Sequence, residues 1–344
     1  MEQQQILGDR EKGKIDELLE KAGKDKLVKE VVEKGKEKPK LEKKEKDSGK
    51  EEYSRPKGFK LLPCAEAGSI IRGIKNHICF NKETGLVYAG IGEESVEYTL
   101  DNALLSAAYS AAGNKKAAKK LIANIEEHIE HVVIFDDNYH LFCIDTFKPD
   151  EPYIERCDEV HADANLAMAA AYIAAGKKEK GLELIKEVEE YGGFLKVGKN
   201  RKLFGENNIN KYERYSGENA LLAYAYSLIG KTDDAMQILE AIEEDIGYYS
   251  VENEETGLIR TKRWDREIET KDTALYALAC FALGNEERGR KLLRAVWTEM
   301  EPKIFGDNSM LFKEDFEYGR FLTAPSAAMA LAHMAEAFYN DRAI

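Results

Sequence analysis

The sequence predicts an all-α protein in which helical hairpins close into a ring. Three observations lead to this prediction: an apolar helical unit that recurs along the chain, an amphipathic helix after most copies of it, and a partner for the last copy near residue 60. The clearest copy spans residues 216–230. It starts with a hydroxyl residue, is apolar on every face and ends at a glycine suited to a left-handed conformation.

Four further copies of this unit begin at residues 99, 162, 270 and 323. The glycines that end the first four copies are separated by 63, 54 and 54 residues, and they are Gly113, Gly176, Gly230 and Gly284. A period of this size indicates a repeat architecture. We therefore expect inner helices over residues 99–112, 162–175, 216–229, 270–283 and 323–338.

The polar residues at the starts of these helices have structural interpretations. We interpret the hydroxyl residues as N-caps, and they are Thr99, Ser216, Thr270 and Thr323. We interpret the acids that follow two residues later as charges that offset the helix dipole, and they are Asp101, Glu218 and Asp272. The fourth residue of each copy is small and polar: Asn102, Asn165, Asn219, Thr273 or Ser326.

The helices that follow the apolar units have an apolar stripe and a Lys- and Glu-rich face, so we place them outside the ring. They are expected over residues 116–129, 179–190, 233–244 and 286–300. The last apolar unit has no such helix after it. A helix expected over residues 61–74 has no apolar partner before it, so we expect it to pack beside residues 323–338 and to complete a fifth hairpin.

The connections from each outer helix to the next inner helix are long and contain short strand-like stretches, such as residues 85–88 and 257–260. An open solenoid is the alternative fold, because the helix pairs also resemble tetratricopeptide-type repeats. Such solenoids repeat near 34 residues with tight turns. The extra length of these connections favours the closed ring.

Residues 59–344 resemble the α/α-toroid superfamily in their order of apolar inner helix, glycine turn, charged outer helix and long return loop. This superfamily includes the six-hairpin glycosidase-like enzymes, sugar 2-epimerases, polysaccharide lyases, terpenoid cyclases and lanthionine synthetases. The resemblance implies a closed toroid and a site at its mouth. It is a resemblance of architecture, and no catalytic motif of a member family matches residue by residue.

Residues 1–58 differ from the rest and are expected to form a separate helical extension with a charged linker. They contain 17 Lys and Arg and 15 Asp and Glu, whereas residues 59–344 contain 34 and 49. Two short amphipathic helices are expected within residues 9–35, where they either dock on the body or bind a protein partner. Residues 36–58 read as a solvated linker.

The composition limits the partners and the compartment. The strongly acidic body argues against nucleic acid as a ligand, and no stretch is long and apolar enough to span a membrane. Five scattered cysteines without CxxC spacing favour reduced thiols in a cytoplasmic protein. Abundant Lys and Glu with few Gln is typical of hyperthermophile proteins.

All return loops are expected at one end of the ring, its mouth, around the N-termini of the inner helices. Loops on a rigid scaffold often carry functional sites. Carboxylates beside aromatic rings suit sugar chemistry, because acids transfer protons while a ring face stacks on the sugar. The catalytic candidates are Asp163, Glu206, Asp265 and His161. The substrate-binding candidates are Tyr153, Arg156, Tyr212, Arg263, Trp264 and Tyr318.

The second repeat departs from the pattern, which marks it as a place where function overrides structure. Its return loop is the longest, and Ala162 replaces the hydroxyl residue at the helix start. Cys157, His161 and Asp163 there suggest an acid–base pair or zinc ligands. Their spacing is no recognised metal motif, so we assign no metal. His333 either joins them across the ring or is a core residue with a hydrogen-bond partner.

The sequence names no reaction, because phosphate-binding, dinucleotide-binding, GxSxG and HExxH motifs are absent and no cofactor is implied. The leading hypothesis is a carbohydrate-active enzyme, a hydrolase, lyase or epimerase, that takes an oligosaccharide or sugar acid at the mouth. The alternative is a non-enzymatic scaffold that binds proteins through the toroid surface and the N-terminal helices.

Overall fold

The computed structural model describes residues 56–92, 97–129, 131–134, 137–143, 161–191, 194–197, 201–204, 214–251, 254–262, 268–315 and 320–342. All of them lie within one unit of the chain, residues 51–344. The described residues form ten helices and eight short strands. The fold below is that of this unit, and the predicted helices at residues 9–35 lie outside the described residues.

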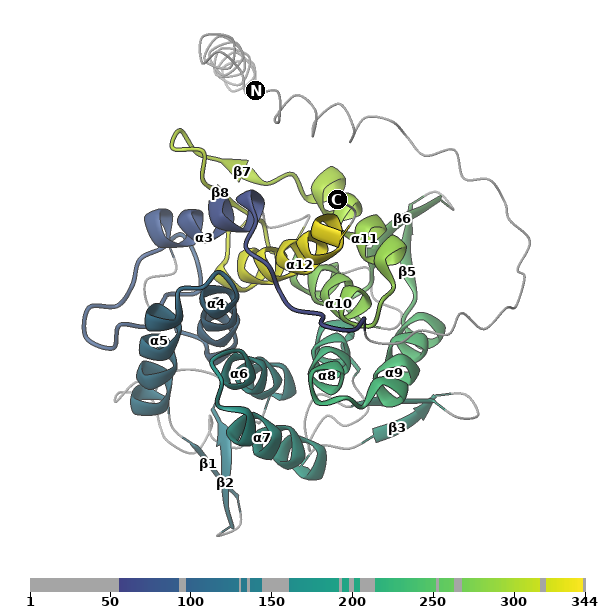
Figure 1. The fold of residues 1–344 in the computed structure, drawn as a ribbon, viewed down its shortest axis with the longest axis horizontal. Helices are drawn as coiled ribbons and strands as arrows, with labels where there is room; N and C mark the ends of the chain where they lie inside the picture. Colours follow the sequence, from purple (N-terminus) through teal and green to yellow (C-terminus); the bar gives the residue numbers. More distant parts are fainter. Residues whose placement is uncertain are drawn as a thin grey trace, which may run out of the picture. The chain divides into compact units, whose positions relative to one another are not determined.

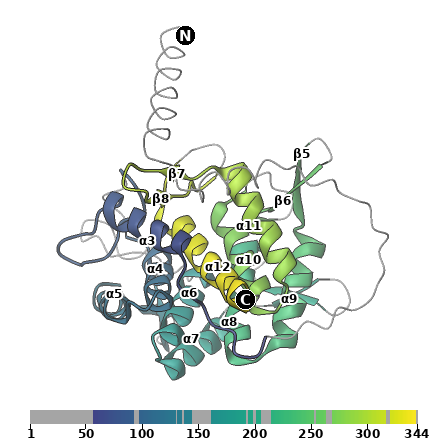
Figure 2. The same cartoon turned by 45° about the horizontal axis from the view of Figure 1, so that its top comes forward.

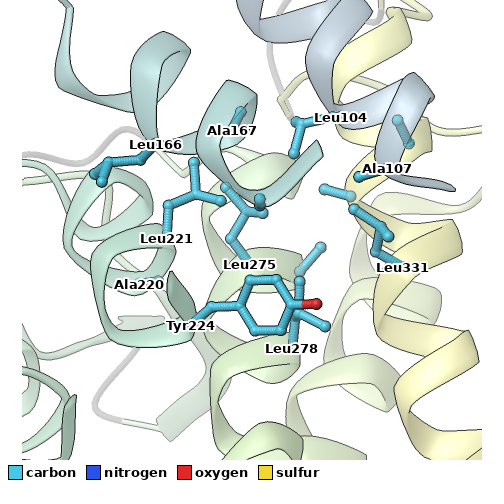
Figure 3. Packing of buried hydrophobic residues seen from close by; sticks show 14 of the residues in the cluster. Leu104, Ala107, Leu166, Ala167, Ala220, Leu221, Tyr224, Leu275, Leu278 and Leu331 are labelled. Atoms are coloured by element: carbon cyan, nitrogen blue, oxygen red, sulfur yellow. The ribbon is translucent and has the colours of Figure 1, made fainter. Parts of the chain in front are cut away.

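The apolar units form the inner helices of a ring (Figure 1). They are α4 (Thr99–Ala111), α6 (Ala162–Ala174), α8 (Ser216–Ile229), α10 (Thr270–Ala282) and α12 (Thr323–Arg342). Nearly every residue of α4, α6, α8 and α10 is buried, because other helices cover all their faces. Leucines and alanines from all five helices meet in the centre (Figure 3). None of the described helices is long and apolar enough to cross a membrane.

The amphipathic helices lie outside this ring, as the sequence predicts. They are α5 (Lys115–His128), α7 (Lys178–Tyr191), α9 (Thr232–Asp245) and α11 (Glu286–Met300). Each packs against the inner helix that precedes it in the chain. Their buried residues are spaced three and four apart, as in Leu121, Ile122 and Ile125 of α5, while the lysines of α5 point to solvent.

The inner helices pack in the order α4, α6, α8, α10, α12, and α12 also packs against α4. An open solenoid would lack this last contact. Helix α3 (Ala65–His77) packs against α12 on the outside, beside the contact between α11 and α12 (Figures 1 and 2). The fifth pair is therefore made from the two ends of the described unit.

Helix α3 begins later than predicted. Residues 61–64 are not helical, because Leu62 precedes Pro63, which disfavours a helical conformation at Leu62. The backbone N–H of Leu62 instead donates to the carbonyl of Met334 on α12, at 2.9 Å. This contact fastens the start of the unit to its last helix, and the helix then runs on past residue 74 to His77.

The return segments contain four antiparallel strand pairs, in agreement with the strand-like stretches in the sequence. They are β1 (His131–Ile134) with β2 (Asp137–Phe142), β3 (Phe194–Val197) with β4 (Arg201–Phe204), β5 (Tyr248–Val251) with β6 (Glu254–Ile259), and β7 (Lys303–Ile304) with β8 (Met310–Leu311). In the first repeat a single bridge joins Phe80 and Val87. Figure 2 shows the β5–β6 and β7–β8 hairpins at one end of the ring.

The small polar residue at the fourth position of the inner helices fastens the return segment of its own repeat. Asn102 Oδ1 accepts from the N–H of Val87 at 2.8 Å, and its Nδ2 donates to the Val87 carbonyl at 3.0 Å. Asn165 makes the same two bonds with Phe142. Thr273 and Ser326 accept from the N–H of Ile259 and Phe312. The recurring polar residue thus satisfies buried backbone groups of the strands.

In α4, α8, α10 and α12 the first residue contacts the return segment of the next repeat instead of capping its own helix. The N–H of Ser216 donates to Thr261, that of Thr270 to Glu314, and that of Thr323 to Ala89 in the first repeat. The hydroxyl groups of Thr99 and Thr323 donate to the carbonyls of Cys143 and Tyr88.

The prediction that Thr99, Ser216, Thr270 and Thr323 are N-caps is therefore wrong. Each is the first residue of its helix, and in α4, α8 and α10 the cap residue is the one before it, without a side-chain capping bond. The physical reason is that the neighbouring return segment supplies carbonyl acceptors, so the helix start is held by tertiary contacts and needs no local cap.

Candidate functional site

Two adjoining cavities of about 210 and 180 Å³ open at the N-terminal ends of the inner helices. They share four lining residues, which are His161, Asp163, Glu269 and Lys271. The first also contains Asp101 and Glu314, and the second contains Glu218 and Asp272. Six carboxyl groups and one lysine ammonium group therefore line this end of the ring among the described residues. We call these cavities together the mouth.

Lys271 stands between carboxylates from two helices. Its Nζ lies 3.4 Å from Oδ2 of Asp163 on α6 and 3.3 Å from Oε2 of Glu269, which precedes α10. The other oxygen of Asp163, Oδ1, accepts from the N–H of Ala164 at 2.7 Å. Both oxygens of Asp163 thus have donors, which fixes the plane of its carboxyl group.

Asp101 and Asp272 have strongly perturbed acidity. Burial raises the pKa of Asp101 to about 8, against the lowering effects of a backbone hydrogen bond from Ala324 and of Lys271. Burial and then the charge of Glu269 raise the pKa of Asp272 to about 8, again against Lys271. Both side chains are therefore mostly protonated at pH 7 and can donate a proton.

These values change the interpretation of Asp101 and Asp272 as charges that offset the helix dipole. A carboxyl group that is mostly neutral at pH 7 contributes little to such an effect. Both residues do lie in the first turn of their helices, as predicted. Their burial among other acids at the mouth, which sequence position does not reveal, overrides the helix dipole.

The close approach of α8 and α10 holds Asp272. A β-carbon at Gly217 would overlap Oδ1 of Asp272, so a larger residue at that position of α8 would displace this carboxyl group. The hydroxyl group of the adjacent Ser216 donates to Asp272 Oδ2 at 3.3 Å. The start of α8 therefore forms one wall around this carboxyl group.

Lys271 itself is well placed to remain charged. Burial alone would lower the pKa of its ammonium group, but the surrounding carboxylates raise it well above its usual value. They are Glu269, Asp163, Asp272 and Glu218. The side chain is 19% exposed, so most of the charged group is out of contact with water. A lysine in this position compensates several buried acids at once.

Comparison with known structures places the chain among proteins of the same architecture. It superimposes on the Lin0763 protein from Listeria innocua with a TM-score of 0.51 and 10% identity, covering 80% of this chain and 97% of that one. The fold is an α/α toroid.

Two further structures are more distantly similar to the toroid. One is a family 76 glycoside hydrolase from a bovine Bacteroides thetaiotaomicron strain, with a TM-score of 0.48, 12% identity and coverage of 74% and 59%. The other is a D-mannose isomerase, with a TM-score of 0.48, 11% identity and coverage of 78% and 79%. No protein-family model and no curated protein sequence matches the chain.

Two of the residues expected from the sequence lie at the mouth of the toroid. Asp163 and His161 line both cavities, and His161 is the residue that precedes α6. The other expected residues lie outside the described residues, in segments that lead into the inner helices: Glu206, Asp265, Tyr153, Arg156, Tyr212, Arg263, Trp264 and Tyr318. Their roles stay predictions.

Sequence reasoning missed Lys271 and the acids that surround it. Lys271 is the second residue of α10, where α6 has Asp163 and α8 has Gly217. A charged residue at this position of an otherwise apolar helix was a signal that could have been used. Its meaning depends on the neighbouring helix, because the partner of Lys271 comes from α6, two positions around the ring.

His333 does not join the mouth. It lies on α12, where its Nε2 accepts from Trp297 Nε1 at 2.9 Å and its Nδ1 lies 3.5 Å from Glu336. It is therefore the core histidine with partners that the sequence left as one of two interpretations. No group of three or more metal-ligating side chains occurs within the described part of the chain, and Cys157 lies outside it.

Proposed function

We propose that the protein is an enzyme that acts on carbohydrates by acid–base catalysis at the mouth of the toroid. The observation that supports this best is the juxtaposition of protonated and charged carboxyl groups. Asp101 and Asp272, with pKa values of about 8, hold protons at pH 7, whereas Asp163 is paired with an ammonium ion. Acid–base catalysis requires one group that holds a proton and a neighbouring group that can accept one.

In a hydrolytic reaction, Asp101 or Asp272 would donate its proton to the leaving oxygen while Asp163 accepts a proton from the attacking water. The water oxygen then forms the new bond to the anomeric carbon as the glycosidic bond breaks. In an isomerase or epimerase, the same acid would protonate a carbonyl oxygen while Asp163 takes a proton from carbon. His161, which also lines both cavities, is the second candidate for the base.

A neutral oligosaccharide or monosaccharide suits the mouth better than a sugar acid. The described lining contains six carboxyl groups, and its lysine is already shared between two of them. Asp101 and Asp272 are mostly neutral at pH 7, but a substrate carboxylate would still meet the charged members of this set, which costs binding free energy in a partly desolvated site.

The test is a panel of neutral and acidic oligosaccharides and monosaccharides, with separate assays for released reducing ends, unsaturated products and interconverted sugars. We expect turnover of a neutral sugar and a loss of kcat of about 100-fold or more in the Asp163→Asn variant. Asp234→Asn is the matched control, because Asp234 is also an aspartate in the first turn of a helix but is exposed on α9. It should retain full activity.

The scaffold alternative makes the opposite prediction. If the full chain neither turns over nor binds any sugar of the panel, but forms a stable complex with a protein that survives gel filtration, the enzymatic proposal is wrong. Turnover that is equally strong in Asp163→Asn would instead remove Asp163 from the mechanism.

A further inference from the structure

Lys271 is the only cationic side chain among the described residues that line the two cavities, and it belongs to both of them. Its ammonium group is shared between Asp163 Oδ2 and Glu269 Oε2 at 3.4 and 3.3 Å. This sharing leaves it poorly placed to bind a substrate anion of its own. Its geometry instead connects α10 with α6 across the end of the ring.

We propose that Lys271 is a positioning residue that holds the Asp163 carboxylate in place and determines which carboxyl groups of the mouth carry a negative charge. This rests on the proposed function in one respect only, the use of Asp163 as a base. The electrostatic role itself is a property of the free protein.

The carboxyl groups that face Lys271 come from several elements around it. Asp272 lies on the same helix, α10, and Glu269 is the residue before that helix. Asp163 lies on α6 and Glu218 on α8. Asp101 on α4 also responds to its charge. The remaining titratable groups of the lining are His161, Glu314, Tyr98 and Tyr215, and Glu314 pairs with Arg320 at 2.6 Å. The described start of α12 contributes only Ala324 and Pro325 to the lining.

The charge of Lys271 acts on these groups in one direction. It lowers the pKa of both Asp101 and Asp272, opposing the burial that raises them. Removing it would therefore make both carboxyl groups bind their protons more tightly, and Asp163 would lose the ammonium group that fixes its Oδ2. The change in proton binding by Asp101 and Asp272 and the loss of the ammonium partner of Asp163 can thus be measured separately.

The first experiment needs no substrate. Aspartate carboxyl carbons are labelled with ¹³C, and their chemical shifts are followed from pH 4 to 10 in the wild type and in Lys271→Met, with Asp101→Asn and Asp272→Asn spectra to assign the two signals. We expect the transitions near pH 8 to move up by about 1 pH unit or more in Lys271→Met. Lys271→Arg, which keeps the charge, should restore them.

Lys180→Met is the control for the loss of one lysine. Lys180 pairs with Glu126 at 2.8 Å, away from the residues that line the mouth. It should leave both transitions unchanged. If Lys271→Met gives the wild-type titration, or if Lys180→Met shifts it equally, the proposal is overturned whatever the activity of the protein.

If Lys271→Met does not fold, a second variant tests the same proposal. The double substitution Glu269→Gln with Lys271→Met keeps the net charge of the cluster, since it removes one negative and one positive charge. Asp163 still loses its ammonium partner in this variant. We expect the carboxyl signal of Asp163 to change in shift while the fold is retained, and an unchanged signal would contradict the positioning role.

The activity assay completes the test once a substrate is known. Lys271→Met should lower kcat by about 10-fold or more with little change in KM, and should move the alkaline limb of the pH profile upward, because the acids lose their protons later. Lys271→Arg should recover most of kcat. Unchanged NMR transitions contradict the role of Lys271, whereas shifted transitions without any sugar turnover contradict the proposed function alone.

Discussion

The hydroxyl group at the start of an inner helix has different surroundings in different repeats. Thr99 Oγ1 donates to the carbonyl of Cys143 at 2.6 Å. Thr270 occupies the same position of α10, yet its buried Oγ1 has no hydrogen-bond partner among the described residues. The same residue type at the same repeat position therefore satisfies a buried carbonyl in one case and remains unsatisfied in the other.

This difference predicts opposite effects of one substitution. Thr99→Val should lower the free energy of unfolding by about 1–3 kcal/mol, because it leaves the buried Cys143 carbonyl without its donor. Thr270→Val should be neutral or stabilising, because valine has nearly the same shape and removes an unsatisfied hydroxyl group. Urea denaturation of both variants measures the two values, and an equal loss in both would contradict the assignment of these hydroxyl groups.

The inner helices end where a glycine adopts a left-handed backbone conformation. Gly113, Gly176, Gly230 and Gly284 have φ between 82° and 87°. A β-carbon at Gly113, Gly176 or Gly230 would meet no atom within 4 Å, so the requirement at these positions is one of backbone conformation. The turn that joins an inner helix to its outer partner depends on this conformation.

We therefore expect Gly176→Ala to lower the free energy of unfolding by about 1–2 kcal/mol, although a β-carbon there meets no atom within 4 Å. Gly306→Ala is the matched control, since Gly306 also has open space around it but no positive φ. It should be neutral or slightly stabilising. Thermal or urea denaturation compares them, and a cost as large at Gly306 would contradict the conformational explanation.

The inner helices could be predicted from the sequence because their determinants are local. An apolar run predicts the existence of α8, and Gly230 fixes its C-terminal end at Ile229 without reference to the rest of the chain. The start of α3 was predicted wrongly although Pro63 is a local signal against a helix at Leu62, and the bond that holds Leu62 to Met334 joins residues that are distant in the sequence. Likewise, Asp163 stood out because its repeat departs from the others, whereas the convergence of Asp101, Asp272 and Lys271 exists only in three dimensions.

The buried acids of the mouth affect the stability of the whole toroid. The pKa of Asp101 and of Asp272 is about 8 in the folded protein, against an ordinary value of 3.8. The folded state therefore binds more protons than the unfolded chain between about pH 4 and 8. Since stability falls with pH where the folded state binds more protons, the contribution of both groups is present below pH 4 and is lost as the pH rises through 8.

We expect the free energy of unfolding to fall by up to about 1 kcal/mol per pH unit for each group between pH 5 and 8. The double variant Asp101→Asn with Asp272→Asn should show a flatter dependence, because an amide does not titrate. Urea denaturation at three pH values in this range measures the slope. A wild-type slope that is zero or positive, or one that the double variant retains, would contradict the raised pKa values.

The predicted boundary at residue 58 also leads to a prediction for the whole chain. Phe59 is buried against Phe338 of α12, with ring centroids 5.2 Å apart, and Leu62 bonds to the same helix. We expect deletion of residues 1–58 to leave the melting temperature nearly unchanged. Deletion of residues 1–62 should lower it by about 5 °C or more, because both contacts are lost. A loss of that size in the shorter deletion would place the boundary closer to the N-terminus.

The position of α12 in the ring determines when the protein can finish folding. During synthesis the ribosome releases α3 and α4 long before α12, and α12 is the helix that packs against both of them and against α10. Until α12 is made, the nascent chain is therefore an incomplete arc of helices with two apolar faces exposed to solvent or to a chaperone. Contacts between segments so far apart in sequence form slowly. The ring can close only after α12 has been synthesised. We expect a chaperone to stay bound longer to stalled chains that end before residue 323 than to chains that include α12.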